Sequence, residues 1–122
     1  MTVDVVRRYG EALDDRDWET ARQLLDPDVE IVRPSGRHYQ GADRWIQLLS
    51  DSEGFDNIES EIAARAYEQR DGRVIEVKDL VHRWRDDGSL AYTSREETVI
   101  AFREGRIARM ESTVEHHQLE TP

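Results

Sequence analysis

The fold of this chain is decided by residues 57–118, which read NIESEIAARAYEQRDGRVIEVKDLVHRWRDDGSLAYTSREETVIAFREGRIARMESTVEHHQ. Four long strand-like runs are separated there by turn signals, which are Asp71-Gly72, Asp86-Asp87-Gly88-Ser89 and Glu104-Gly105. Turns of this kind join neighbouring strands that run in opposite directions. The stretch therefore predicts an antiparallel meander whose long strands bend into a strongly curved sheet.

The sequence before this meander predicts three helices. Apolar residues recur at helical spacing over residues 5–13, a second helix starts at the capping residue Asp17, and a third opens near Gly41. Asp26-Pro27 is expected to end the second helix, because proline disfavours helical geometry in the residue before it. Alternation over residues 29–32 predicts one short strand between the second and third helices.

Helices followed by a meander indicate an α+β fold. Three N-terminal helices are expected to lie against a curved antiparallel sheet, with an internal cavity between the two layers. A chain of 122 residues is large enough for one core and too small for two. We therefore expect residues 1–122 to form a single domain.

Composition excludes several classes of function. The sequence has no cysteine, which rules out disulfides, thiolate nucleophiles and cysteine-ligated metals. Its 27 acidic and 17 basic residues give a net charge of -10, which works against nucleic-acid binding. No apolar run approaches the ~20 residues of a membrane span, and the amino terminus lacks the apolar stretch of a signal peptide. We therefore expect a cytoplasmic protein without nucleic-acid or membrane partners.

The last two strand-like runs carry the polar residues that matter for chemistry. On both runs the even-numbered positions form the more apolar face, which predicts that they point inward. If a three-residue connection closes this hairpin, Thr98 lies opposite Ser112. Ser94 then lies opposite His116, with Glu96 within reach of the imidazole on the diagonal. A carboxylate on an inward face is costly unless it is paired or solvated, so Glu96 is a strong candidate for a functional role.

The first two strand-like runs differ in how many of their faces are apolar. Over residues 58–68 the apolar residues Ile58, Ile62, Ala64 and Ala66 all occupy even positions, so we expect one buried face there. Over residues 73–84 both faces carry apolar residues, and Asp79 and His82 lie on opposite faces, so at most one of them can face the cavity. Two covered faces in so small a chain indicate a second copy, and we expect a homodimer.

Short segments spread over nearly the whole chain carry a family resemblance. They are Val5-Val6-Arg7-Arg8-Tyr9, Ala12-Leu13, Asp17-Trp18, Leu24-Leu25-Asp26-Pro27-Asp28-Val29, Pro34, Gly41-Ala42-Asp43 and Phe102-Arg103-Glu104-Gly105-Arg106-Ile107. Together they resemble the nuclear transport factor 2-like superfamily, and within it the SnoaL-like polyketide cyclases and the ketosteroid isomerases. The resemblance implies a cone-shaped, cystatin-like α+β fold with a ligand cavity at the open end, often in a dimer.

The catalytic residues of these relatives match this sequence only in part. In ketosteroid isomerases a tyrosine of the first helix donates a hydrogen bond to the developing enolate, and Tyr9 stands at the matching position. The base before a proline corresponds to Arg33, and the aspartate that partners the tyrosine corresponds to Thr98. The last aspartate of limonene epoxide hydrolases corresponds to Ser112, and the histidine and aspartate of the cyclases correspond to Thr98 and Glu115. Because arginine cannot abstract a proton at neutral pH, isomerisation by the steroid-isomerase route is not expected.

These observations define a predicted site. The predicted catalytic residues are Tyr9, Glu96 and His116. The predicted ligand-binding residues are Trp18, Arg33, His38, Tyr39, Trp45, Tyr92, Thr98, Ile100, Met110, Ser112 and Val114. Each catalytic candidate has an alternative role. Tyr9 can be a packed core tyrosine, Glu96 can form a structural salt bridge to Arg33, and His116 can be an exposed histidine near the terminus. Metal-ligand spacing is absent from the sequence, so we expect neither a metal nor a cofactor.

Two classes of function remain open at this point. The first is a cofactor-free general acid-base enzyme, a cyclase, isomerase or dehydratase, that acts on a hydrophobic carbonyl-bearing small molecule such as a polyketide, steroid or terpenoid. The second is a non-catalytic small-molecule-binding or dimerisation module of the same fold. An enzyme needs convergent titratable groups in its cavity, whereas a binding module needs only a complementary shape.

Overall fold

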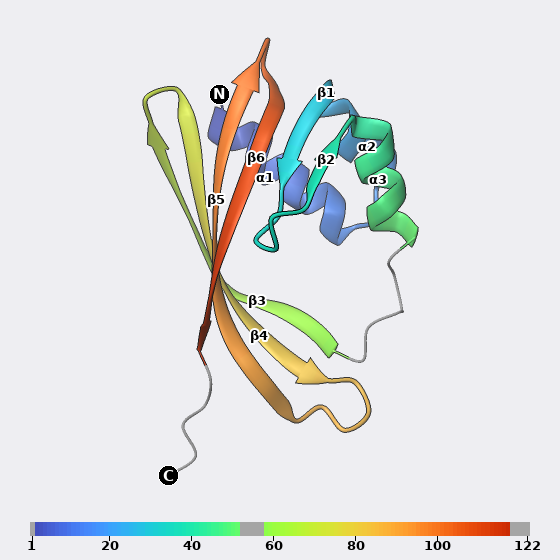
Figure 1. Ribbon diagram of the computed structural model, residues 1–122, viewed down its shortest axis with the longest axis vertical. Helices are drawn as coiled ribbons and strands as arrows, with labels where there is room; N and C mark the ends of the chain where they lie inside the picture. Colours follow the sequence, from blue (N-terminus) through green and yellow to red (C-terminus); the bar gives the residue numbers. More distant parts are fainter. Residues whose placement is uncertain (1, 52–57, 118–122) are drawn as a thin grey trace.

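The computed structural model describes residues 2–51 and 58–117 of the chain (Figure 1). Its helices are α1 (Thr2–Asp14), α2 (Trp18–Gln23) and α3 (Ala42–Asp51). Its strands are β1 (Leu25–Val32), β2 (His38–Gln40), β3 (Ile58–Arg70), β4 (Arg73–Trp84), β5 (Leu90–Arg103) and β6 (Arg106–His117). Helices precede the meander, as predicted. Within the described residues, no helix is both long enough and apolar enough to cross a membrane.

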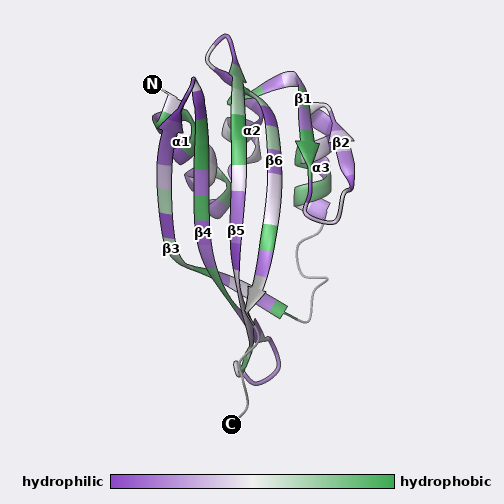
Figure 2. Cartoon of the chain, turned by 60° about the vertical axis from the view of Figure 1, so that its left-hand side comes forward, coloured by the Kyte–Doolittle hydropathy of each residue, from purple (hydrophilic) through white to green (hydrophobic). Residues whose placement is uncertain are grey.

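The strands form one curved sheet in the order β2-β1-β6-β5-β4-β3. From β3 to β6 all neighbours are antiparallel, as predicted. β1 pairs with β6 in parallel, so the complete sheet is mixed, with the predicted antiparallel meander as its larger part. The reason is that β6 ends the meander with a free edge, and β1 reaches that edge from the helices rather than through a hairpin. The three helices lie together on one side of the sheet, as Figure 2 also shows, which confirms the predicted α+β fold class.

The connection Glu104-Gly105 sets the register of β5 and β6. Both residues have positive φ, 51° and 77°, which suits the tight two-residue turn that matches strand twist. The prediction of a three-residue connection is therefore wrong. The predicted pairing of Thr98 with Ser112 is nevertheless present, because β6 carries one extra residue, Ala108, at a β-bulge between the turn and this pair.

A second bulge changes which side chains of β3 point inward. Ile62 pairs with Leu80, but Ala64 pairs with Asp79, so one residue of β3 is skipped between the two pairs. Such a slip moves each later side chain to the other face. The prediction that the even positions of this strand share one buried face is therefore wrong beyond Ile62. Arg65 gains an inward position and lines the cavity.

Capping and strand pairing shape the chain between α1 and β1. The carboxylate of Asp17 accepts a hydrogen bond of 3.2 Å from the backbone N–H of Thr20, so it caps α2 as predicted. The helix ends before the predicted stop at Asp26-Pro27, because Leu25 already belongs to β1 and lies opposite Ile107 of β6. Long-range pairing therefore ends this helix before the proline does.

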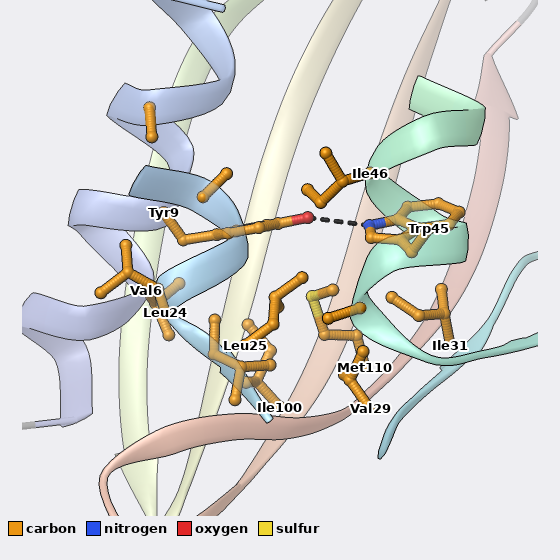
Figure 3. Close-up of a cluster of buried hydrophobic side chains, with 14 of the residues drawn as sticks. Val6, Tyr9, Leu24, Leu25, Val29, Ile31, Trp45, Ile46, Ile100 and Met110 are labelled. Carbon is orange, nitrogen blue, oxygen red and sulfur yellow. Dashed lines mark hydrogen bonds between the residues drawn. The ribbon is translucent and has the colours of Figure 1, made fainter. Parts of the chain in front are cut away.

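The hydrophobic core lies between the helices and the inward face of the sheet (Figure 3). Its largest fully buried side chains are Leu25, Ile31, Ile100, Ile107, Val6, Val29 and Val74. These residues come from α1, β1 and the last three strands, so the core joins the parallel edge of the sheet to the meander. Polar side chains continue the same inward face of β4, β5 and β6 and line a cavity.

Candidate active site

A cavity of about 150 Å³ lies against α1, α3 and the inward face of the sheet. Its apolar wall is formed by Val6, Leu13, Ile31, Trp45, Ile62, Ile100 and Met110. Its polar wall is formed by Tyr9, Asp14, Arg33, Arg65, Glu76, Lys78, Glu96, Thr98 and Ser112. Space of about this size accepts a small ring compound rather than several fused rings.

The cavity brings together a large part of the predicted site. The predicted residues on its wall are Tyr9, Arg33, Trp45, Glu96, Thr98, Ile100, Met110 and Ser112. His116 lies opposite Ser94 in the backbone register, as predicted, while its side chain lies outside the described part of the chain. A catalytic role for His116 therefore stays a prediction.

The remaining predicted residues, as far as the structure describes them, stand apart from this wall. They are Trp18, His38, Tyr39, Tyr92 and Val114. The exposed His38 ring lies 2.8 Å from Glu30, between its Nε2 and the Oε1 of the carboxylate. Tyr39 packs behind the wall, with its ring centroid 5.6 Å from that of Trp45. His38 and Tyr39 therefore contact the edge of the sheet and the back of the wall rather than the cavity.

Tyr9 presents a hydroxyl group to the cavity. The indole N–H of Trp45 donates a 2.9 Å hydrogen bond to the oxygen of this hydroxyl (Figure 3). Because an indole nitrogen can only donate, the tyrosine oxygen is the acceptor and its own hydrogen stays available to a ligand. Burial raises the pKa of Tyr9 to about 12, although Trp45 and Arg33 both act to lower it. Tyr9 is therefore a neutral hydrogen-bond donor at physiological pH.

The raised pKa of Tyr9 predicts a loss of stability at high pH. The unfolded chain releases this proton near pH 10, whereas the folded chain holds it until about pH 12. The stabilising contribution is therefore complete below pH 10 and is lost as the pH rises through this interval. The loss amounts to about 2–3 kcal/mol in the free energy of unfolding.

Urea unfolding of the wild type and of Tyr9→Phe, repeated at rising pH, measures this effect. We expect the phenylalanine variant to lack the part of the decrease above pH 10 that belongs to Tyr9, because its position 9 carries no phenolic proton. An identical alkaline decrease in both proteins would assign the titration to another group. Tyr67→Phe measures the part of the alkaline decrease that belongs to Tyr67, the other tyrosine whose pKa burial raises.

Glu96 is the buried carboxylate of the predicted site, with 9% of its surface exposed. Its Oε1 lies 3.6 Å from Nη1 of Arg33, which is the salt bridge foreseen as the alternative role. At this separation the contact is electrostatic rather than a hydrogen bond. Arg33 follows the end of β1 and also lies over the ring of Trp45, 5.9 Å from its centroid. The guanidinium compensates the carboxylate while leaving its oxygens able to accept a proton from a ligand.

Thr98 and Ser112 form a hydroxyl pair next to this carboxylate. Their side-chain oxygens are 2.8 Å apart, across the β5 and β6 register described above. Either hydroxyl can donate to the other, and the pair uses only one of its two hydrogens. The second hydrogen can serve a carbonyl or hydroxyl group of a ligand.

Four charged residues of the cavity wall were not expected from the sequence, and they are Asp14, Arg65, Glu76 and Lys78. The Nε of Arg65 lies 3.5 Å from Oε2 of Glu76, and the Nζ of Lys78 lies 3.7 Å from Oε1 of the same carboxylate. Glu76 and Lys78 occupy even positions of β4, so alternation could have placed them on the inward face. Arg65 could not have been found in this way, because the bulge in β3 reverses the alternation.

His82 occupies the inward face farther along β4, whereas Asp79 forms an ion pair on the outward face. The Nδ1 of His82 lies 2.7 Å from the hydroxyl of Ser60, and its Nε2 lies 2.7 Å from that of Ser94. The ring also stacks on Tyr92 with centroids 4.2 Å apart. This buried network joins β3, β4 and β5. Among the described residues, no group of three or more potential metal ligands is formed.

Comparison with known proteins agrees with this architecture. A nuclear transport factor 2-like protein of Burkholderia xenovorans LB400 is 14% identical, with a TM-score of 0.78, over 93% of this chain and 88% of its own. A candidate polyketide cyclase of Xanthomonas campestris pv. campestris is 18% identical, with a TM-score of 0.76, over 92% of this chain and 88% of the cyclase. An LEH-like epoxide hydrolase of M. tuberculosis is 18% identical, with a TM-score of 0.73, over 93% of this chain and 82% of the hydrolase.

At these identities, likeness to solved structures shows the fold alone. No curated protein matches the sequence. The sequence model of the SnoaL-like domain, in contrast, matches residues 6–110, which include most of α1 and most of the cavity wall. Because this match spans most of the chain, the protein belongs to the SnoaL-like domain family.

Proposed function

We propose that the chain is a cofactor-free general acid-base enzyme of the isomerase or lyase type, acting on a hydrophobic carbonyl-bearing small molecule. The observation that carries the proposal is the presence of Tyr9 and Glu96 on the wall of one cavity. One is a neutral hydroxyl donor and the other is a buried carboxylate, so the site offers both an oxyanion stabiliser and a base.

The proposed reaction starts with the carbonyl oxygen of the substrate hydrogen-bonded to the hydroxyl of Tyr9. Glu96 removes a proton from the carbon next to the carbonyl, and the enolate oxygen takes the charge that Tyr9 stabilises. Return of the proton to another carbon gives an isomer, and loss of a neighbouring hydroxyl group gives a dehydrated product. The Thr98 and Ser112 hydroxyl pair can hold a second oxygen of the substrate.

The size of the cavity narrows the class of substrate. A space of about 150 Å³ favours a monocyclic terpenoid or a short polyketide over a steroid. Relatives of the same fold include a candidate polyketide cyclase and an LEH-like epoxide hydrolase, so small-molecule chemistry occurs on this architecture.

The alternative is a non-catalytic binding or dimerisation module. The ion pair between Arg33 and Glu96 favours this alternative, because a compensated carboxylate can be purely structural. Substitution of Glu96 by glutamine separates the two functions. Only in the enzyme does this change abolish proton transfer while the fold and ligand binding are kept.

We also propose that the outward face of the sheet forms a twofold dimer. Ile75, Val77 and Val81 lie on the face of β4 opposite to the cavity and are only half-buried in the single chain. A second copy would bury this apolar stripe. Val77→Arg is expected to give a monomer, and it should keep the fold because Glu97 lies opposite and can pair with the new charge.

Light scattering of the wild type, Val77→Arg and the conservative Val77→Ile measures this assembly. We expect a dimer for the wild type and for the isoleucine variant, and a folded monomer for the arginine variant. A wild-type monomer at micromolar concentration would overturn the proposed interface.

A further inference from the structure

Lys78 is the only lysine of the sequence, and it lies on the wall of the cavity. Its side chain is 22% exposed, so the amine is partly desolvated. A lysine differs from arginine in one chemical respect that matters here. It can lose its proton and attack a carbonyl carbon, whereas a guanidinium keeps its charge and does not.

The neighbours of Lys78 across the sheet are charged on both sides. Arg65 of β3 and Glu96 of β5 are its partners in register, and Glu76 is the carboxylate closest to its amine. A second cation opposite a lysine is one of the arrangements found around nucleophilic lysines. Glu76 is also shared with Arg65, so its negative charge is divided between two cations.

Three cations lie on the wall of the cavity. They are Arg33, Arg65 and Lys78, and the buried carboxylates beside them are Glu76 and Glu96. Of the three, only Lys78 carries a nitrogen that can act as a nucleophile toward a carbonyl carbon, because a guanidinium keeps its charge.

We propose that Lys78 is a covalent nucleophile that forms an iminium ion with the carbonyl group of a small ketone or aldehyde in the cavity. The class of substrate, a small carbonyl compound, is taken from the proposed function. The covalent bond to Lys78 is an additional step, which acid-base catalysis by Tyr9 and Glu96 does not require. A protonated nitrogen double-bonded to carbon withdraws electrons more strongly than a carbonyl, so it makes the adjacent carbon more acidic.

The step balances with the groups that line the cavity. The ammonium group of Lys78 gives one proton to the carboxylate of Glu96 in the facing strand, and its nitrogen forms a C–N bond to the carbonyl carbon. The carbonyl oxygen leaves as water, with one hydrogen from the amine and the other returned by Glu96. The carboxylate so formed can then take the proton from the adjacent carbon to give an enamine. Water reverses the sequence and frees the lysine.

Reductive trapping tests this proposal directly. The full chain is incubated with benzaldehyde, a probe of about the size of the cavity, and cyanoborohydride, which delivers hydride to the C=N bond and leaves a stable secondary amine. Intact-mass and peptide mass spectrometry then locate the adduct. Apart from any adduct at the α-amino group, we expect one adduct on Lys78, formed at least about 10-fold faster than on an exposed lysine, because the cavity holds the aldehyde beside the amine.

The control is a protein in which the lone lysine is moved to the surface. Lys78→Arg combined with Arg44→Lys places it on the exposed face of α3. Lys78→Arg by itself should lose the adduct and keep its melting temperature. Trapping at Lys78 no faster than at the relocated lysine would overturn the proposal.

Failure of the trapping experiment at Lys78 can be distinguished from failure of the proposed acid-base function. Trapping requires no turnover, so it can succeed in a protein that performs no proton transfer through Glu96. Conversely, an enzyme that loses turnover in Glu96→Gln but forms no adduct at Lys78 would retain the acid-base mechanism and exclude the covalent route.

Discussion

Replacing Glu96 by glutamine is expected to lower turnover by about 10² to 10⁴ while the fold and ligand affinity are kept, which is the usual contribution of a general base. Glutamine has nearly the same shape as glutamate and cannot accept the proton. Because Glu96 is buried on the cavity wall, the loss of turnover in this variant reports on a group of the proposed site.

The assay does not need the natural substrate. Exchange of hydrogen for deuterium next to the carbonyl of cyclohexanone in heavy water, followed by NMR, reports proton abstraction itself. Glu97→Gln is the matched control, because Glu97 is the next residue of β5 and its side chain is exposed. We expect this control to exchange at the wild-type rate.

A structural carboxylate would behave differently. Glu96 would then serve mainly as the partner of Arg33, and its replacement would lower the melting temperature with exchange lost only in step with unfolding. Unchanged exchange at unchanged stability would remove Glu96 from the site and leave the binding module as the better account of the cavity.

Truncation of Ile107 to alanine is expected to lower the free energy of unfolding by about 2–5 kcal/mol, as for other large-to-small changes in a packed core. Ile107 is fully buried, with 0% of its surface exposed. Its backbone N–H donates a 2.9 Å hydrogen bond to the carbonyl of Leu24, and it lies opposite Leu25 in the parallel pair. The cavity left by the truncation would lie where β1 joins the meander.

Urea denaturation of Ile107→Ala and Leu48→Ala measures this difference. Leu48 lies on α3 with 40% of its surface exposed, so its truncation should cost less than about 1 kcal/mol. A total stability of about 5–15 kcal/mol is typical of such a domain, so the core variant would be close to the limit of folding at 37 °C. A loss at Ile107 no larger than that at Leu48 would show that the parallel edge contributes little to the stability of the chain.

The meander and its inward face followed from local features of the sequence. Side chains alternate between the faces of a strand, so the placement of Glu96, Thr98 and Ser112 on one face needed no knowledge of the rest of the molecule. Turn residues and the capping residue Asp17 act on the backbone next to them, so the places of the turns and of the α2 cap were predicted correctly, although the length of the last turn was not.

The β-bulges, in contrast, could not be predicted from these local features of the sequence. The extra residue Ala108 and the bulge in β3 leave no mark in composition, yet each changes the side to which later residues point. Arg65 reached the cavity only through such a bulge. The parallel pairing of Leu25 with Ile107 was equally hidden, because it joins the two halves of the chain.

Which side chains meet in the cavity was decided by tertiary structure alone. Tyr9 comes from α1 and its partner Trp45 from α3, while Glu96 of β5 meets Arg33 beyond the end of β1. Sequence patterns place each residue on a face, but they do not set the distances between elements. Those distances follow from how the whole core packs, and a hydrogen bond or an ion pair exists only within a few tenths of an ångström of its proper length.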